Sequence, residues 1–401
     1  MKILYVVHQF FPNHYTGTER VTLQIAKQIQ FMGNFVSVLT YEPNNTIDGF
    51  VSFDNHVSKS EYQFETIPVI AFKTDEKKRD YNIYQKSLEK YLKPIIKEFD
   101  LVHIIHPMRL GSVMKVCSDL NIPTILTLTD NWLLCPQGLL TKNMQLCDGP
   151  DAGKKCQSAC SYGDEILSRY SDAKSFLNAA DMVFVGCEFL KENIQMNNWR
   201  HDIQVNMYSV DFSYVKPEVQ ENDEIVFAFI GSLIWQKGAH ILINSFKKIK
   251  SDKIKLKIFG SGVEGDVYPE RVLSMIKDDT RIEYCGIFEY HDLPEIMNKI
   301  SVVVIPSLYK EIYPLVMQLS FAYKKPVIAS KIGGLPESIL DGINGYLFEI
   351  GNVQQLTSIL SMISDNPEIL TKLKKNIHNP PRIEEEAFIY ENAYRQLLSK
   401  K

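Results

Sequence analysis

Short runs of β-branched and aromatic residues recur along this chain, with segments of helical length between them. This alternation is typical of βαβ units, in which helices cover both faces of a parallel sheet. The pattern predicts strands in the first half of the chain at 3–7, 36–39, 69–72, 102–105, 124–128 and 182–185. The series then restarts at 226–230, 256–259, 282–285, 302–305, 327–329 and 346–348. It therefore predicts an α/β protein with two tandem, doubly wound, Rossmann-like domains.

The two series are separated by a polar stretch from Tyr208 to Asp223, which contains a proline and predicts the interdomain linker. We therefore expect a first domain over 1–210 and a second domain over 211–382. The segment 383–401 has apolar residues at helical spacing after two prolines, which predicts a last helix that returns to the first domain. Open α/β sheets bind ligands outside the carboxyl ends of their strands. Functional residues are therefore expected in a cleft between the domains.

The composition argues against several classes of function. The 401 residues include 44 Lys and Arg against 48 Asp and Glu, so no excess of positive charge points to nucleic acid. The apolar runs are much shorter than the ~20 residues that cross a bilayer. The apolar segment at the amino terminus is too short for a signal peptide, so we expect a cytoplasmic protein.

Two segments of the second half have the chemistry of an anion site. A helix is expected to begin near Pro314, so that the backbone N–H groups of Leu315 and Val316 can hold a phosphate. Lys237, on the loop after the 226–230 strand, would add a point charge on a diphosphate. Each element alone is compatible with an ordinary solvated turn. Their order along the chain favours a nucleotide site.

These segments together resemble the nucleotide-sugar-binding domain of the retaining glycosyltransferases of family 4, which have the two-domain GT-B fold. The matching stretches of the second half are 231–238, 259–262, 286–288 and 306–345. In the first half the resemblance continues at 17–19, 100–106 and 127–132. The resemblance covers nearly the whole chain and implies two Rossmann-like domains with a cleft between them.

The resemblance also implies roles for particular residues. Glu311 matches the first glutamate of the family's E-x7-E motif, which contacts the donor sugar, and Lys237 matches a lysine on the diphosphate. These two are the implied catalytic residues. The implied donor-binding residues are Gly17, Thr18, Ser232, Gly260, Gly262, Ile287, Pro314, Leu315 and Val316. On the acceptor side we expect Glu19, His106 and Asp130.

Three positions depart from the family pattern. Leu319 stands where the second glutamate of E-x7-E would contact the ribose. Ser232 replaces an arginine beside the phosphate lysine, and Thr129 replaces a histidine before Asp130. Loss of a charged hydrogen bond at position 319 would cost ~1.5–3 kcal/mol of donor binding unless another group replaces it. The base and the sugar of the donor therefore stay open.

These observations predict a retaining glycosyltransferase that moves a sugar from a nucleotide-diphosphate donor to a hydroxyl of a glycan or a lipid-linked acceptor. The expected setting is bacterial cell-surface polysaccharide synthesis, and the transfer step would need no cofactor. Two alternatives stay open. A non-catalytic family member that acts as a partner or scaffold is favoured by the three departures, and a nucleotide-sugar epimerase would have the same architecture.

The segment from Lys73 to Lys97 is rich in lysine, with apolar residues interleaved. One interpretation is a solvated helix packed on the sheet. The other is a patch that contacts a membrane surface, which would place the protein at the inner face of the membrane.

Four of the seven cysteines, Cys135, Cys147, Cys156 and Cys160, fall within 26 positions of one loop. Thiolates so close in sequence suit a structural zinc ion that would order the loop. Their spacing lacks the usual pair of cysteines separated by two residues. Reduced packed cysteines, disulfides formed under stress and an iron–sulfur centre are the alternatives.

Overall fold

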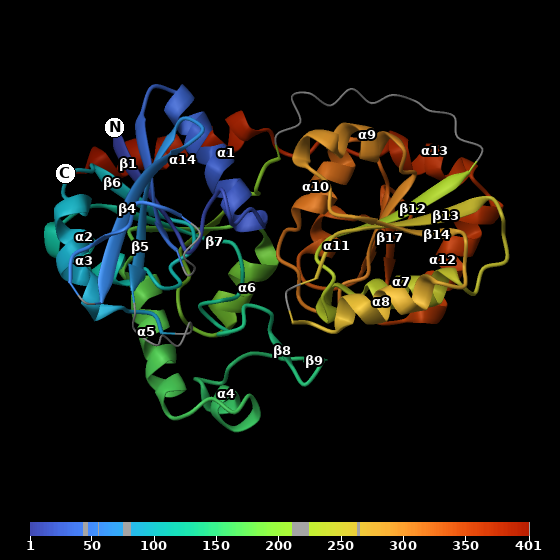
Figure 1. The fold of residues 1–401 in the computed structure, drawn as a ribbon, viewed down its shortest axis with the longest axis horizontal. Coiled ribbons are helices and arrows are strands. Elements are labelled where there is room, and N and C mark those ends of the chain that lie inside the picture. Colours follow the sequence, from blue (N-terminus) through green and yellow to red (C-terminus); the bar gives the residue numbers. More distant parts are fainter. Residues whose placement is uncertain (43–46, 55, 75–81, 211–223, 263–264, 401) are drawn as a thin grey trace. The chain divides into compact units, whose positions relative to one another are not determined.

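The computed structural model describes residues 1–42, 47–54, 56–74, 82–210, 224–262 and 265–400. The chain forms two compact units. The first consists of Met1–Lys142, Cys147–Ser209 and Pro381–Lys401, and the second of Asn143–Leu146 and Val210–Pro380. Most of the predicted linker, 211–223, lies outside the described residues. Each unit contains a largely parallel sheet with helices packed on it (Figure 1).

The sheet of the first unit has nine strands in the order β11-β10-β7-β6-β1-β2-β5-β4-β3. Its parallel strands are β1 (Lys2–Val7), β2 (Phe35–Tyr41), β5 (Ile67–Thr74), β6 (Leu101–Ile104), β7 (Thr124–Leu128), β10 (Met182–Val185) and β11 (Ile203–Val205). Two antiparallel strands, β3 (Val51–Ser52) and β4 (Val57–Phe64), extend one edge. The order in which strands are added reverses at β1, which lies between β2 and β6.

The sheet of the second unit has six parallel strands in the order β14-β13-β12-β15-β16-β17. They are β12 (Ile225–Ile230), β13 (Ile254–Phe259), β14 (Ile282–Gly286), β15 (Val302–Ile305), β16 (Val327–Ser330) and β17 (Gly345–Phe348). This is the doubly wound order of nucleotide-binding sheets, and its reversal falls between β12 and β15. A further two-stranded sheet is formed by β8 (Thr141–Lys142) and β9 (Gln145–Leu146).

Helices cover these sheets. Those of the first unit are α1 (Gly17–Phe31), α2 (Glu89–Ile96), α3 (Ser112–Leu120), α4 (Lys154–Ala159), α5 (Glu165–Ala179), α6 (Glu188–Met196) and α14 (Ile383–Leu398). Those of the second are α7 (Ala239–Phe246), α8 (Tyr268–Ile276), α9 (Leu293–Asn298), α10 (Leu315–Ala322), α11 (Leu335–Ser338), α12 (Val353–Asp365) and α13 (Glu368–Lys375). In the second unit, α9 and α10 lie on one side of the sheet and α7, α8 and α12 on the other (Figure 1). Buried aromatic and aliphatic side chains such as Phe227, Phe246 and Leu256 form the core between these layers.

Every strand predicted from the sequence overlaps an observed strand, whereas β3, β4, β8, β9 and β11 were not predicted. Four of these five have only two or three residues, too few to show a period. Strand β4 is longer, but it carries Ser, Lys, Glu and Gln side chains and is only partly buried. Its pairing with β5, rather than its composition, makes it a strand.

The lysine-rich segment contains α2, whose apolar side is buried through Leu92 and Ile96 while Lys90 and Lys93 are exposed. The helix packs against α3. This arrangement favours a solvated helix on the sheet over a membrane-contacting patch; residues 75–81 of the segment lie outside the described part. Within the described residues, no helix is long and apolar enough to cross a membrane.

Helix α14 packs against α1 in the first unit (Figure 1). Its contact with the sheet includes a buried chain of polar groups. His103 on β6 forms hydrogen bonds through Nδ1 with the Tyr394 hydroxyl (2.7 Å) and through Nε2 with Thr127 Oγ1 (2.8 Å). Tyr394 also bonds to the Tyr5 hydroxyl at 2.8 Å. Burial lowers the pKa of His103 to about 3, so this histidine is a neutral interior residue, as its strand position suggests.

Glu386 on α14 is also buried in this interface. Its Oε2 accepts hydrogen bonds from the backbone N–H of Ser209 (2.7 Å) and from Ser209 Oγ (2.6 Å). Its Oε1 has no hydrogen-bond partner among the described residues. Burial raises the pKa of Glu386 to about 8, which outweighs the opposing effect of the two Ser209 hydrogen bonds. The folded protein therefore keeps this carboxyl protonated at neutral pH.

This burial predicts a pH-dependent stability. The unfolded chain releases the Glu386 proton near pH 4.5 and the folded chain near pH 8, so the free energy of unfolding should fall between these values, by at most about 1.4 kcal/mol per pH unit. Glu386→Gln is a close mimic of the protonated carboxyl and should remove this slope. Urea unfolding at pH 5 and pH 8 measures it: the variant should match the wild type at pH 5 and exceed it at pH 8. If the free energy of unfolding changed equally between pH 5 and pH 8 in the wild type and in the variant, this would contradict a Glu386 carboxyl that is protonated in the folded protein.

Candidate functional site

Polar side chains lie at the strand-order reversal of each sheet, and three of them, His106, Lys237 and Glu311, were predicted from the sequence. In the first unit His8 follows β1 and His106 follows β6 closely, and these are neighbouring strands. In the second unit Lys237 lies on the loop after β12 and Glu311 on the loop after β15, also neighbours. The loops at such a reversal diverge to opposite faces and leave room for a ligand. Each unit therefore has a candidate site at the carboxyl edge of its sheet.

Lys237 and Glu311 form an ion pair in the second unit. Lys237 Nζ donates to Glu311 Oε1 at 2.8 Å and to the Tyr309 hydroxyl at 2.8 Å. The Glu311 carboxylate accepts two more hydrogen bonds, from Ser307 Oγ to Oε1 and from the Tyr309 hydroxyl to Oε2, each 2.6 Å long. The side chain of Glu311 is 5% exposed and that of Lys237 is 26% exposed. The buried Glu311 carboxylate thus accepts three hydrogen bonds, while the Lys237 side chain stays partly exposed.

The charges of this cluster reinforce one another. Burial alone would lower the pKa of Lys237, but the negative charge of Glu311 and hydrogen bonds to Glu311 and Tyr309 raise it above its usual value. Burial and the same carboxylate raise the pKa of the Tyr309 hydroxyl. At neutral pH Lys237 is therefore an ammonium group and Tyr309 a neutral phenol.

Two glycines explain how the loops approach so closely. Gly238 has φ +72° and lies where a Cβ would be 2.0 Å from the carbonyl oxygen of Pro306. Gly333 has φ +60°, and its Cβ would be 2.1 Å from the carbonyl oxygen of Glu311. That same carbonyl accepts a hydrogen bond from Gly334 N–H at 2.9 Å. Side chains at 238 and 333 would push apart the backbone segments that hold Lys237 and Glu311.

Helix α10 begins just after Glu311, with Pro314 as its extended N-cap residue. Its first residues, Leu315 and Val316, are partly exposed, and first-turn N–H groups have no partner within a helix. One turn further on, Leu319 is partly exposed whereas Gln318 is buried at 1% exposure. Gln318 therefore points into the unit and does not take the place of the carboxylate expected at 319.

The glycine-rich turns of the second unit pack on one another. Gly260 N–H donates to the carbonyl of Gly286 at 2.7 Å, and a Cβ on Gly260 would be 1.9 Å from the Gly231 carbonyl oxygen. Gly262 approaches Pro269 in the same way. Ser232 and Ile287 are exposed beside these turns, Ile287 to 68%. The predicted contacts of these residues with a nucleotide stay predictions.

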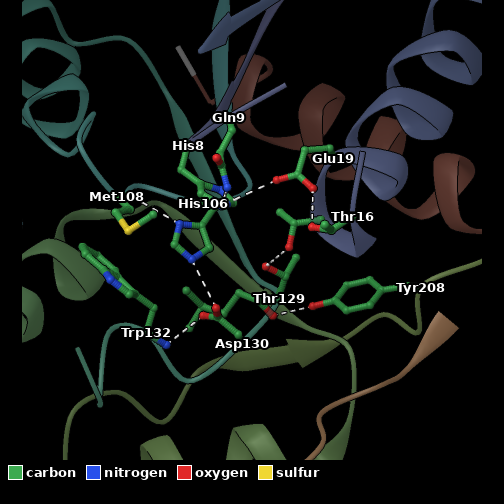
Figure 2. A network of polar contacts seen from close by, with 12 residues as sticks. His8, Gln9, Thr16, Glu19, His106, Met108, Thr129, Asp130, Trp132 and Tyr208 are labelled. Carbon is green, nitrogen blue, oxygen red and sulfur yellow. Dashed lines mark hydrogen bonds and ion pairs between the residues drawn. The ribbon is translucent and has the colours of Figure 1, made fainter. Parts of the chain in front are cut away.

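In the first unit, His106 and Asp130 form a pair (Figure 2). His106 Nδ1 accepts a hydrogen bond from the backbone N–H of Met108 (3.3 Å), so Nε2 carries the proton and donates to Asp130 Oδ2 (3.3 Å). Asp130 Oδ1 accepts from the backbone N–H of Trp132 at 2.7 Å. The Asp130 side chain is 41% exposed and that of His106 is 5% exposed. The histidine therefore orients a carboxylate that remains accessible.

Glu19 and His8 extend this cluster (Figure 2). Glu19 on α1 is fully buried; its Oε2 accepts from Thr16 Oγ1 at 2.6 Å, and Oε1 lies 3.5 Å from His8 Nε2. The His8 ring lies against the ring of His106, with centroids 4.2 Å apart. Burial is the main cause that lowers the pKa of His8, so its ring is neutral. The sequence analysis missed His8, although its place directly after a central strand is the same indication that selected His106.

Gly17 and Thr18 begin α1. Thr18 Oγ1 donates to Thr129 Oγ1 at 3.1 Å, a contact between residues 111 positions apart, and Gly17 is exposed. The helix start is thereby tied to the loop that carries Asp130. Thr129 stands where the resemblance to family 4 implies a histidine, and in this chain its hydroxyl has a structural contact.

The cysteine loop gives no support to the predicted zinc site at Cys135, Cys147, Cys156 and Cys160. Among the residues that the structure describes, no group of three or more His, Cys, Asp or Glu side chains is arranged to hold a metal ion. No disulfide joins any of the seven cysteines. Burial, with added effects of Cys135, Cys160 and Cys147, raises the pKa of Cys156 to about 11.

Comparison with known proteins finds a family model that matches the second unit. Residues 212–379 match the family model of glycosyl transferases group 1. An uncharacterised glycosyltransferase of Methanocaldococcus jannaschii is 27% identical over 281 residues, 69% of each chain. The O-antigen chain mannosyltransferase C of Escherichia coli is 21% identical over 100% of both chains. The lipopolysaccharide 1,2-N-acetylglucosaminetransferase of Salmonella typhimurium is 30% identical over 31% of this chain and 35% of that enzyme.

Solved structures are similar over the full length. HepE of Anabaena, solved in complex with UDP, has a TM-score of 0.72 at 17% identity and 100% coverage of both chains. Sucrose-phosphate synthase of Thermosynechococcus elongatus has a TM-score of 0.74 at 16% identity and the same coverage. These likenesses confirm the predicted GT-B fold with Rossmann-like domains. Together with the match of the second unit, they support a GT-B glycosyltransferase.

The close approach at Gly333 predicts the effect of a side chain there. Gly333→Ala introduces a Cβ that collides with the Glu311 backbone, in addition to the ~1–2 kcal/mol of strain that an L residue has at positive φ. Gly342→Ala is a matched control, because Gly342 has φ +71° and nothing within 4 Å of its Cβ position. Thermal unfolding should show a larger loss of stability for Gly333→Ala than for Gly342→Ala. Equal losses would show that position 333 is not packed on the Glu311 loop.

Proposed function

We propose that this protein is a retaining glycosyltransferase of family 4, which transfers a sugar from a nucleotide-diphosphate donor to a hydroxyl of a glycan or lipid-linked acceptor. The Lys237–Glu311 pair at the strand-order reversal of the second unit carries this proposal. The segment 211–382 would bind the donor, and 1–210 with the helix 383–401 would bind the acceptor. Cell-surface polysaccharide synthesis is the proposed setting, because the similar Escherichia coli and Salmonella proteins are an O-antigen chain mannosyltransferase and a lipopolysaccharide N-acetylglucosaminetransferase.

In this proposal Lys237 and the first N–H groups of α10 bind the diphosphate. The ammonium group would neutralise negative charge that develops on the leaving phosphate as the bond from the sugar to its oxygen breaks. The accessible side of Lys237 and the position of Leu315 after a proline N-cap support this role. Glu311 would accept a hydrogen bond from a hydroxyl of the donor sugar. No cofactor is needed for such a step.

The proposed acceptor site consists of Asp130 with His106 and Glu19. Asp130 would accept a hydrogen bond from the acceptor hydroxyl, while His106 holds its carboxylate in place. The acceptor oxygen would then form its bond to the sugar on the face from which the phosphate departs. The proton of the acceptor hydroxyl would pass to the departing phosphate oxygen. This front-face step keeps the configuration of the sugar and needs no nucleophile from the protein, as the resemblance to family 4 implies.

The donor role of Glu311 predicts a loss of activity without loss of fold. Glu311→Gln removes a charged hydrogen-bond acceptor, which is worth about 1.5–3 kcal/mol, so turnover should fall roughly 10- to 150-fold. The assay measures release of UDP, GDP or ADP from a panel of nucleotide sugars, with and without octyl glycoside acceptors. Glu295→Gln is the matched control, because Glu295 also pairs with a lysine, Lys299, but lies exposed on α9.

Full turnover in Glu311→Gln would refute the assigned role. A folded wild type that binds no nucleoside diphosphate in calorimetry would refute the enzyme proposal as a whole. That second result would favour the non-catalytic partner suggested by Leu319, Ser232 and Thr129.

The acceptor role of Asp130 predicts a different kinetic change. Asp130→Asn should lower transfer to an acceptor by about tenfold or more, because the acceptor hydroxyl loses a charged partner. Hydrolysis of the donor by water should change much less. Asp181→Asn serves as the control: Asp181 accepts from Thr124 N–H (2.7 Å) at the opposite, amino-terminal edge of the same sheet. A parallel fall of transfer and hydrolysis in Asp130→Asn would contradict an acceptor-side role.

A further inference from the structure

The loop after β15 carries two hydroxyl groups that contact the Glu311 carboxylate, Ser307 Oγ and the Tyr309 hydroxyl. We propose that Ser307 and Tyr309 are positioning residues, which leave the Glu311 carboxylate one open acceptor position for a single hydroxyl of the donor sugar. This inference rests on the proposed function and extends it from Glu311 to the groups that orient it. Ser307 is fully buried, and Tyr309 is partly buried.

The hydrogen bonds of Glu311 define this open position. An ionised carboxylate has about four acceptor positions, two on each oxygen. Oε1 accepts from Ser307 Oγ at 2.6 Å and from Lys237 Nζ at 2.8 Å, so both of its positions are filled. Oε2 accepts from the Tyr309 hydroxyl at 2.6 Å. Within the described part of the chain, the acceptor position that remains is therefore on Oε2.

Lys237 likewise keeps one N–H group for a further hydrogen bond. An ammonium group has three N–H bonds. Lys237 donates one to Glu311 Oε1 and one to the Tyr309 hydroxyl, each at 2.8 Å. The third N–H remains, on a side chain that is 26% exposed. A donor can therefore bind without breaking the Lys237–Glu311 pair, with a phosphate oxygen on Lys237 and one sugar hydroxyl on Glu311.

Tyr309 contacts both charged groups through its hydroxyl. Its hydroxyl accepts a hydrogen bond from Lys237 Nζ and donates one to Glu311 Oε2, so the direction of both hydrogen bonds is determined. Its ring lies 5.0 Å from Lys237 Nζ, within the range of a cation–π contact. Removing only the hydroxyl would keep the ring and both charges. It would open a second position on Oε2 and allow the carboxylate to rotate.

The expected consequence is specific to the sugar part of the donor. In this proposal a nucleoside diphosphate contacts Lys237 and the backbone N–H groups at the start of α10, and Tyr309→Phe leaves both in place. The sugar hydroxyl meets Glu311, whose orientation Tyr309→Phe releases. Binding of a nucleotide sugar and its turnover should therefore suffer, while binding of the nucleoside diphosphate should not.

Calorimetry with three pairs of ligands tests the inference. The pairs are UDP with UDP-glucose, GDP with GDP-mannose, and ADP with ADP-glucose. For the pair that the wild type binds, Tyr309→Phe should change the Kd of the nucleoside diphosphate by no more than about twofold from the wild-type value. It should raise the Kd of the nucleotide sugar about tenfold. The kcat for that donor should fall by a similar factor. The control is Tyr323→Phe: Tyr323 is 2% exposed, and its hydroxyl has no hydrogen-bond partner among the described residues, so both constants should stay unchanged.

Ser307 supplies an independent variant. Ser307→Ala should weaken the binding of the nucleotide sugar but not that of the nucleoside diphosphate. Ser307→Thr keeps a hydroxyl and should bind the nucleotide sugar as the wild type does. Tyr309→Phe that behaves like Tyr323→Phe would overturn the inference. Equal weakening of nucleoside diphosphate and nucleotide sugar would also overturn it, because a general structural role would then explain the loss. A wild type that binds none of the six probes would overturn the proposed function, and the inference with it.

Discussion

The strand order of each parallel sheet reverses once, and both candidate sites depend on that reversal. Crossover connections between parallel strands are right-handed, so strands added in opposite directions send their helices to opposite faces of the sheet. The loops after β12 and β15 therefore leave neighbouring strands and diverge, as do those after β1 and β6. Backbone groups and side chains at these loops can face a ligand without disturbing the core. The proposed functional residues of this protein lie at these two places.

Placing an ion pair at such an opening has a cost, because Glu311 is nearly buried and loses its hydration. The cost is offset by hydrogen bonds from Ser307, Tyr309 and Lys237, which surround the carboxylate. Two glycines make this possible, since only a residue without Cβ allows the loops to touch at Pro306 and at the Glu311 carbonyl. Backbone packing and side-chain electrostatics thus act together: the glycines bring the charges close, and the hydroxyls keep them there.

The two histidines of β6 and its following loop show how position decides chemistry. His103 and His106 are three residues apart, and both use their two ring nitrogens in hydrogen bonds. The partners of His103 are the interior hydroxyls of Tyr394 and Thr127, so the ring serves the packing of α14. The partner of His106 is Asp130, which is 41% exposed. The same side chain therefore stabilises the fold at one position and orients an accessible carboxylate at the other.

Much of this protein could be predicted from its sequence. The alternation of apolar strands with helical segments determines an α/β fold, because buried parallel strands must be apolar on both faces. The order of Lys237, Glu311 and the start of α10 indicated the proposed donor site, since each element follows a strand and its place on the sheet edge comes from the chain order. Strand β4 and His8 were not predicted, because neither a half-polar edge strand nor one buried histidine has a distinctive pattern.

Only the tertiary structure decided which groups touch. The sequence places four cysteines in one loop, but proximity along the chain does not orient sulfur atoms, and the described residues contain no group arranged for a metal. It places Gln318 beside Leu319, but the helix turns Gln318 into the interior. It shows Tyr309 two residues before Glu311, yet the bond between them depends on how the loop closes. The sequence by itself determined the architecture and the chemistry available at each edge, because both follow from local pattern and chain order. Packing decided which of these groups form hydrogen bonds with one another, because hydrogen bonds depend on distances that only a folded chain has.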